Sequence, residues 1–192
     1  SMVREGLSID NPELDKRAFC VERIFHGNPS GIDHTVSMLG GSVRYRRTAS
    51  GAQFEQVDLP HLPIVVIDSG SAGNTADMVA GVAAQKANLE TELNAMGTLL
   101  DATMPALQAG DLGAIGSAWQ ENHRLLQAIG VSTPTLDTIV QLSMTAGAAG
   151  AKLAGAGGGG VVIAISEDVD AIVQAATTAG FKAFATASYP VV

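Results

Sequence analysis

The sequence predicts an α+β fold, with a helical layer on one face of a mainly antiparallel sheet. Three observations support this fold class: strand-type runs lie between residues 42 and 68, helical periodicity follows from 74 to 147, and strand-type runs return around a stretch of glycines. Strands, then helices, then strands again are typical of a sheet whose helices gather in one layer.

The N-terminal part is expected to hold two helices separated by a turn. Helical periodicity extends from Pro12 to Phe25, and residues His26 to Gly31 interrupt it with glycine, asparagine, proline and serine. A second helix is expected from Ile32 to Leu39. Its first turn carries Asp33, where the positive end of the helix dipole favours an acidic side chain, and Gly40-Gly41 ends it.

Strands and helices alternate in blocks along the remaining chain. Three strands are expected at Ser42 to Arg47, Gln53 to Leu59 and Ile64 to Asp68. Two mainly apolar stripes mark the helices that follow: Val79, Val82, Ala83, Lys86 and Leu93 form one, and Ile115, Trp119, Asn122, Leu126 and Ile129 form the other. Thr133-Pro134 opens a further helix with a cap residue and a proline. The last elements are strands at Ala151 to Ala154 and Val161 to Ile165, a helix at Asp168 to Ala179 and a strand at Phe181 to Ser188.

Composition limits the class of protein. The 192 residues suit one domain, or one large domain with a fragment of a second, and the formal net charge of −8 argues against a nucleic-acid partner. The longest apolar run, Val161 to Ile165, is too short to cross a bilayer, so we expect no membrane partner and a cytoplasmic location. Cys20 is the only cysteine, which excludes an internal disulfide and a thiolate metal cluster.

The segment Gly155 to Gly160 contains five glycines and one alanine. Glycine leaves no Cβ in the way, so consecutive backbone N–H groups can approach an anion closely. The segment lacks the lysine of a Walker loop and the spacing of a dinucleotide fingerprint. A flexible linker is the alternative. The strand-type runs that end before it and resume at Val161 favour a tight loop at a sheet edge, facing a phosphate or another glycine loop.

The segment His26 to Asp33 is a rigid turn that presents an acid at the start of a helix. Asp33 could be a reactive carboxylate or only a helix cap. Glu22 lies near the end of the preceding helix, so a tight turn could bring two carboxylates towards one cleft. Paired acids at a phosphate site suit Mg²⁺ binding and proton transfer.

These segments resemble a known family. Residues His26 to Asp33, followed by Gly40 to Tyr45, are similar to the catalytic segment of mevalonate kinases. Lys152 to Gly160 resemble the third motif of the galactokinase, homoserine kinase, mevalonate kinase and phosphomevalonate kinase superfamily, and Asn74-Thr75 and Asn122-His123 fall in the family's order. The resemblance implies a two-lobed fold, in which residues 1–40 are a remnant of the N-terminal lobe with the catalytic turn and residues 41–192 are the ferredoxin-like C-terminal lobe.

The resemblance also implies a role for each site residue. Asp33 would receive or position the proton of the substrate hydroxyl, and Glu22 would hold Mg²⁺. The residues expected to bind ATP are Gly155, Ala156, Gly157, Gly158 and Gly159, and those expected to bind the substrate are His26, Ser30 and Thr75.

The implied activity is ATP-dependent phosphorylation of mevalonate to phosphomevalonate in the isoprenoid pathway, with ATP and Mg²⁺ as cofactors. The first lobe's glycine-rich loop and the lysine that would face Asp33 are absent from this sequence. The expected partners are therefore a small-molecule substrate and the missing N-terminal lobe, and a homodimer stays open. Ala76 and Ala154 depart from the family's pattern and put the substrate in question. Another superfamily kinase, such as a phosphomevalonate kinase, and a non-catalytic lobe that is inactive alone are the alternatives.

Other polar residues have simpler interpretations. His123 adjoins the stripe that contains Trp119, which favours a packed histidine over a ligand. Residues Ser69 to Gly73 follow a strand, and they could contact a ligand or form a plain strand-to-helix turn.

Overall fold

The computed structural model describes residues 13, 16–21, 30–48 and 51–188. The chain divides into two compact units, one within residues 1–58 and the other from Leu59 to Ser188, and each unit has its own sheet. The predicted boundary after residue 40 concerns the two lobes of the whole protein, not these compact units, and it stays a prediction.

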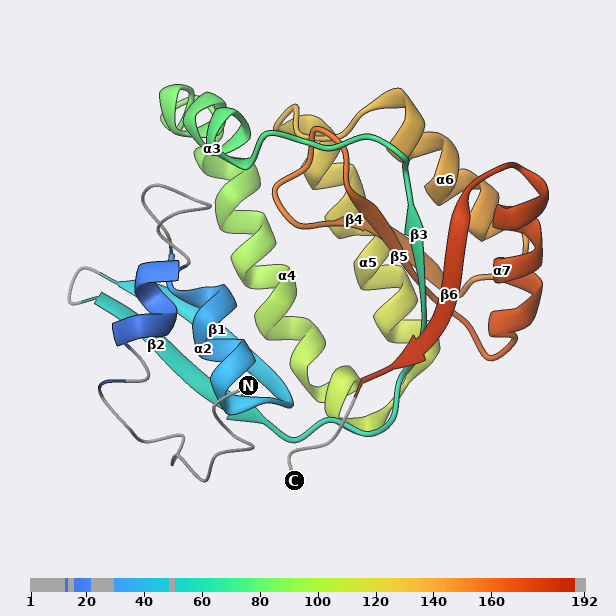
Figure 1. Ribbon diagram of the computed structural model, residues 1–192, viewed down its shortest axis with the longest axis horizontal. Helices are drawn as coiled ribbons and strands as arrows, with labels where there is room; N and C mark the ends of the chain where they lie inside the picture. Colours follow the sequence, from blue (N-terminus) through green and yellow to red (C-terminus); the bar gives the residue numbers. More distant parts are fainter. Residues whose placement is uncertain (1–12, 14–15, 22–29, 49–50, 189–192) are drawn as a thin grey trace. The chain divides into compact units, whose positions relative to one another are not determined.

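The first unit contains helical residues 16–21, a short helix and a β-hairpin (Figure 1). Helix α2 spans Ile32–Leu39, and β1 (Ser42–Thr48) pairs antiparallel with β2 (Gly51–Val57). Gly31 and Gly40 flank α2 with φ of 87° and 66°, a region that glycine adopts without strain, so the predicted end of this helix is confirmed. Tyr45 and Phe54 are cross-strand partners, and their ring centroids lie 5.2 Å apart.

The second unit is built on a four-stranded antiparallel sheet in the order β4-β5-β3-β6. Its strands are β3 (Pro63–Asp68), β4 (Gly150–Ala154), β5 (Val161–Ile165) and β6 (Lys182–Ala187). Its helices are α3 (Thr75–Ala84), α4 (Glu90–Ala109), α5 (Leu112–Ala128), α6 (Pro134–Thr145) and α7 (Val169–Thr178). Strand order and connections give the β-α-β-β-α-β arrangement of a ferredoxin-like sheet, which confirms the predicted fold class.

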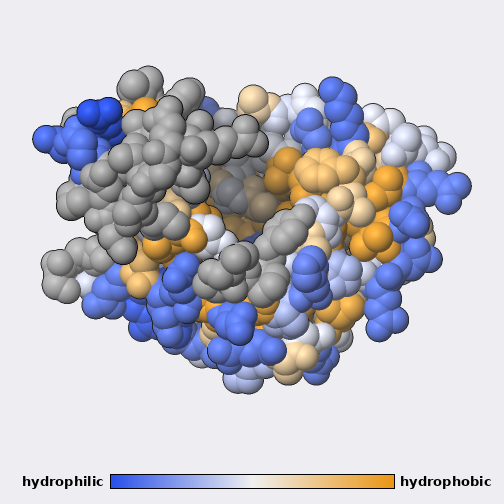
Figure 2. All heavy atoms as spheres, turned by 60° about the horizontal axis from the view of Figure 1, so that its bottom comes forward, coloured by the Kyte–Doolittle hydropathy of each residue, from blue (hydrophilic) through white to orange (hydrophobic). Residues whose placement is uncertain are grey.

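The main core lies between one face of this sheet and helices α6 and α7 (Figure 1). Alternate strand residues point to the same face, so Val65 and Ile67 of β3 are both fully buried there against side chains such as Ile139 of α6. Ile165 points to the opposite face and joins Ile115 of α5 in a smaller cluster. Hydrophobic areas also reach the surface (Figure 2), and the exposed large apolar side chains of this unit are Val79, Leu100 and Phe184.

Helix α5 runs unusually close to the edge strand β4. A Cβ on Gly116 would collide with the backbone of Ala149 and Gly150, and a Cβ on Gly150 would collide with the backbone of Gly116. Both positions need glycine because the two backbones occupy the space that a side chain would take.

One expectation about the helices was wrong. The stripe from Val79 to Leu93 belongs to two helices, because α3 ends at Ala84 and α4 begins at Glu90. The Gln85 N–H turns back to the carbonyl oxygens of Val82 and Ala83, and this tight turn ends α3. No helix in residues 16–21, 30–48 or 51–188 is long and apolar enough to cross a membrane.

Candidate functional site

The glycine run forms the hairpin between β4 and β5, so the predicted ordered loop is confirmed. Its five glycines have φ between 72° and 149°, a region that other residues rarely adopt. Gly158 donates its N–H to the Val131 carbonyl oxygen at 2.8 Å, and Gly160 donates to the Ser71 carbonyl oxygen at 2.8 Å. These bonds hold the run in one shape and exclude a free linker.

A second loop, Ser69 to Gly73, packs directly against the glycine run. A Cβ on Gly159 would lie only 2.8 Å from the Gly73 nitrogen, and a Cβ on Gly73 would lie 3.1 Å from the carbonyl carbon of Gly158. The Ser69 N–H also donates to the Gly160 carbonyl oxygen at 2.9 Å. Residues Ser69 to Gly73 thus connect β3 to α3, and they also form the glycine-containing loop that packs against the glycine run.

This second loop leads into α3, whose first residue is the predicted substrate residue Thr75. Asn74 caps the helix, and its Oδ1 accepts from the N–H groups of Ala76 at 3.0 Å and Asp77 at 3.3 Å. Met78, on the next turn of α3, touches the glycine run, because a Cβ on Gly158 would lie 2.9 Å from its Sδ. The fold therefore brings the start of α3 and the glycine run together.

The other predicted site residues belong to the first unit. Asp33 is exposed in the first turn of α2, and the N-cap position is occupied by Gly31 rather than by Asp33. The Ser30 Oγ accepts from the Ile32 N–H at 3.3 Å. Glu22 and His26 lie outside the described residues, so their predicted roles in Mg²⁺ and substrate binding stay predictions. Within the described ranges, no group of three acidic, histidine or cysteine side chains is placed to hold a metal ion.

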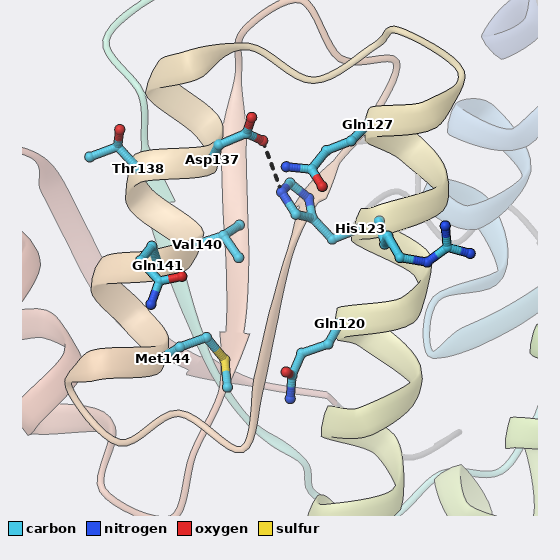
Figure 3. Close-up of a pocket in the computed structure, with 9 residues that line it drawn as sticks. Gln120, His123, Gln127, Asp137, Thr138, Val140, Gln141 and Met144 are labelled. Carbon is cyan, nitrogen blue, oxygen red and sulfur yellow. Dashed lines mark hydrogen bonds and ion pairs between the residues drawn. The ribbon is translucent and has the colours of Figure 1, made fainter.

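A polar network beside the glycine run was missed by sequence reasoning (Figure 3). The His123 side chain on α5 is only 6% exposed, and its Nε2 lies 3.0 Å from Oδ1 of Asp137 on α6. Its Nδ1 lies 3.4 Å from the backbone nitrogen of Leu153 on β4. A carboxylate accepts and a backbone N–H donates, so we assign the proton to Nε2 and the acceptor role to Nδ1. The neutral imidazole connects α5, α6 and β4, which agrees with the predicted packed histidine.

The pKa values of this network favour a neutral imidazole beside a charged carboxylate. Burial lowers the pKa of His123, against the raising effect of Asp137. Burial would raise the pKa of Asp137, but hydrogen bonds from Ser132 and Gln127, together with His123, lower it overall. The Ser132 Oγ donates to Oδ1 of Asp137 at 2.5 Å.

The network adjoins the residues that hold the glycine run. Ser132 follows Val131, whose carbonyl oxygen accepts from Gly158, and Leu153 lies just before the run. The network also lines one wall of a cavity of about 490 Å³ between α5 and α6, where Figure 3 shows His123 and Asp137 pointing toward each other. The sequence predicted that Thr133-Pro134 opens α6, and this start is confirmed. It puts Asp137 in the first turn of the helix.

Comparison with known proteins agrees with these features. Residues 103–183 match the family described as GHMP kinases C terminal. The mevalonate kinase of Thermococcus gammatolerans is 37% identical over 183 residues, which is 90% of this chain and 53% of that protein. The crystal structure of L. major mevalonate kinase in complex with R-mevalonate has a TM-score of 0.86 at 32% identity, over 97% of this chain and 60% of that one.

A more distant structure shares the fold alone. The Streptococcus pneumoniae phosphomevalonate kinase in complex with phosphomevalonate and AMPPNP has a TM-score of 0.75 at 19% identity, over 97% of this chain and 64% of that one. The chain spans about half the length of the curated relatives it matches. The glycine hairpin, the ferredoxin-like sheet and the sequence similarity agree. Residues 103–183 carry the C-terminal domain of GHMP kinases, and the chain is similar over most of its length to the C-terminal part of mevalonate kinases.

Proposed function

We propose that the whole protein, of which this chain spans a part, is an ATP-dependent kinase that phosphorylates the hydroxyl group of mevalonate. The observation that carries the proposal is the glycine run, which Val131 and Ser71 fix beside the start of α3 at Thr75. Similarity to the mevalonate kinase of Thermococcus gammatolerans supports the choice of substrate.

The glycine run offers only part of its backbone to a phosphate. The N–H groups of Gly158 and Gly160 are used inside the protein, and Gly157 and Gly159 are buried. The partly exposed Ala156 has an N–H group with no acceptor among the described residues, and such a group suits a phosphate oxygen. We infer that this run borders the ATP site and that the missing N-terminal lobe supplies most contacts with the triphosphate.

Two carboxylates complete the proposed site. Asp33, exposed on α2, would take or orient the hydroxyl proton, and Glu22 would hold Mg²⁺, while His26, Ser30 and Thr75 would position the substrate. Bound Mg²⁺ would neutralise charge on the phosphates. Phosphoryl transfer requires mainly positioning and charge stabilisation, which these side chains and the backbone N–H of Ala156 can supply.

The test is an assay of ADP release by the whole protein, with mevalonate, phosphomevalonate and galactose as separate substrates. We expect turnover of about 10 per second with mevalonate and ATP-Mg²⁺, and no measurable turnover by the 192-residue chain alone. Turnover with phosphomevalonate but not with mevalonate would assign the protein to another activity of the superfamily. No turnover with any of the three would reject the kinase proposal.

A further inference from the structure

A cavity of about 380 Å³ lies between α4 and α5, beside the edge strand β4. Its walls are mainly apolar and include Met96, Leu99, Leu100, Leu107 and Trp119. Leu100 is 43% exposed, so the cavity is accessible from the surface of the second unit. The two polar side chains that matter here, Lys152 and Asn122, line this cavity together.

Lys152 is a charged residue in a cavity that is lined mainly by apolar side chains. Its neighbours Ala151 and Leu153 point into the main core, so Lys152 points to the opposite face of β4. No described side chain forms an ion pair or a hydrogen bond with its ammonium group. Burial lowers the pKa of Lys152, and no acidic neighbour opposes that effect. A buried cation without a counterion is costly unless something pairs with it.

Asn122 presents a second unsatisfied group to the same cavity. Its Oδ1 is buried and has no hydrogen-bond partner within the described part of the chain. The oxygen and nitrogen of an amide are exchanged by a flip of the side chain, so the same position can present an N–H donor. After such a flip, Lys152 and Asn122 would both offer donors to this mainly apolar cavity.

We propose that this cavity binds a small carboxylate with an unbranched apolar chain, whose carboxylate contacts Lys152 and Asn122 and whose chain lies among Met96, Leu100 and Trp119. One ammonium matches one negative charge, and a carboxylate accepts from both donors. The apolar walls favour an alkyl chain over a water cluster, because water needs polar partners on several sides. None of the residues that line this cavity is among those proposed to bind ATP or mevalonate, and the proposal does not depend on the kinase activity.

Trp119 is the only tryptophan in the chain, so its fluorescence reports on the cavity directly. The probe is hexanoate, titrated into the 192-residue chain, and its expected Kd is about 1 mM for a ligand of this size. The matched ligands are 1-hexanol, which lacks the charge, hexylamine, which has the opposite charge, and acetate, which lacks the chain. We expect hexanoate to bind about tenfold or more tightly than each of them.

The matched variants are Lys152→Met, which removes the ammonium but keeps an apolar stem, and Lys182→Met, which removes an exposed lysine of β6. Lys152→Met should weaken hexanoate binding about tenfold or more and leave 1-hexanol binding unchanged, whereas Lys182→Met should bind both as the wild type does. Equal affinity for hexanoate and 1-hexanol, an unchanged Kd in Lys152→Met, or no change in Trp119 fluorescence would each overturn the proposal. The comparison of ligands uses the wild-type chain, so it remains decisive if Lys152→Met does not fold.

Discussion

The buried His123 side chain on α5 forms a hydrogen bond through its Nε2 with Oδ1 of the partly exposed Asp137 on α6, and the two atoms lie 3.0 Å apart. The opposite ring nitrogen of His123 accepts from the N–H of Leu153, so one imidazole joins two helices to the edge strand. If the ring took up a second proton, Nδ1 would become a donor. Two N–H groups would then face each other, and the hydrogen bond from Leu153 would be lost. The connection therefore depends on a neutral imidazole.

We expect the free energy of unfolding to fall as the pH drops below about 6.5, the ordinary pKa of histidine. Burial lowers the pKa of His123 in the folded state, so between its folded pKa and 6.5 the unfolded chain binds more protons and is favoured by acid. His123→Gln keeps a donor and an acceptor but does not titrate, and should lose less stability over this range. Urea unfolding at a series of pH values measures the difference. The control is His61→Gln, which changes an exposed histidine in the connection between β2 and β3. An acid dependence in His123→Gln as steep as in the wild type would contradict this role.

Gly155 and Gly157 have the same φ but different surroundings. Replacing each by alanine therefore separates the cost of backbone strain from the cost of a collision with neighbouring atoms. Both have φ of 86°, but a Cβ on Gly157 would lie 2.8 Å from the Cβ of Val131, whereas a Cβ on Gly155 meets nothing within 4 Å. Gly155→Ala should therefore cost only the strain of the backbone, about 1–2 kcal/mol. Gly157→Ala should cost about 1–3 kcal/mol more, because the two segments must move apart. Denaturant unfolding of both variants measures this, and equal losses would show that close packing at Val131 is unimportant.

Lys152→Met should raise the free energy of unfolding near neutral pH. Burial lowers the pKa of Lys152 below its usual 10.5, so the folded state holds the ammonium less readily than the unfolded chain does. Wild-type stability should then rise with pH between the folded pKa and 10.5, and the advantage of Lys152→Met should shrink over that range. Denaturant unfolding at several alkaline pH values tests this, with Lys182→Met as the control. A constant difference between Lys152→Met and wild type at all pH values would refute the burial argument.

In the whole protein, Asp33→Asn should lower kcat roughly a hundredfold or more with saturating ATP, Mg²⁺ and mevalonate, the scale of a lost general base. Asparagine keeps the size and helix-start preference of Asp33, so thermal stability should stay near that of the wild type. Asp170→Asn changes an acid in the first turn of α7 in the same way and should keep normal turnover. Near-normal kcat in Asp33→Asn would return Asp33 to a structural role.

Local sequence was sufficient for most of the fold. The β-branched run from Val161 to Ile165 predicted a paired strand, and with it an ordered glycine hairpin, because such residues need partners in a sheet. Thr133-Pro134 placed the start of α6, and Gly40 placed the end of α2, because caps and stops depend only on neighbouring residues. The break between α3 and α4 was not predicted, because the apolar stripe continued in phase across it.

The site was predicted only in part. The glycine run and Thr75 carry recognisable local patterns, whereas the contact between His123 and Asp137 joins two helices across a connection whose path the sequence does not show. Burial of Lys152 is also a tertiary result, because it depends on how α4 and α5 cover the outer side of β4. Periodicity along one segment defines which residues share a face, but it does not define which segment covers that face. Chain packing therefore decided the partner of His123, the surroundings of Lys152 and the loop that faces the glycine run.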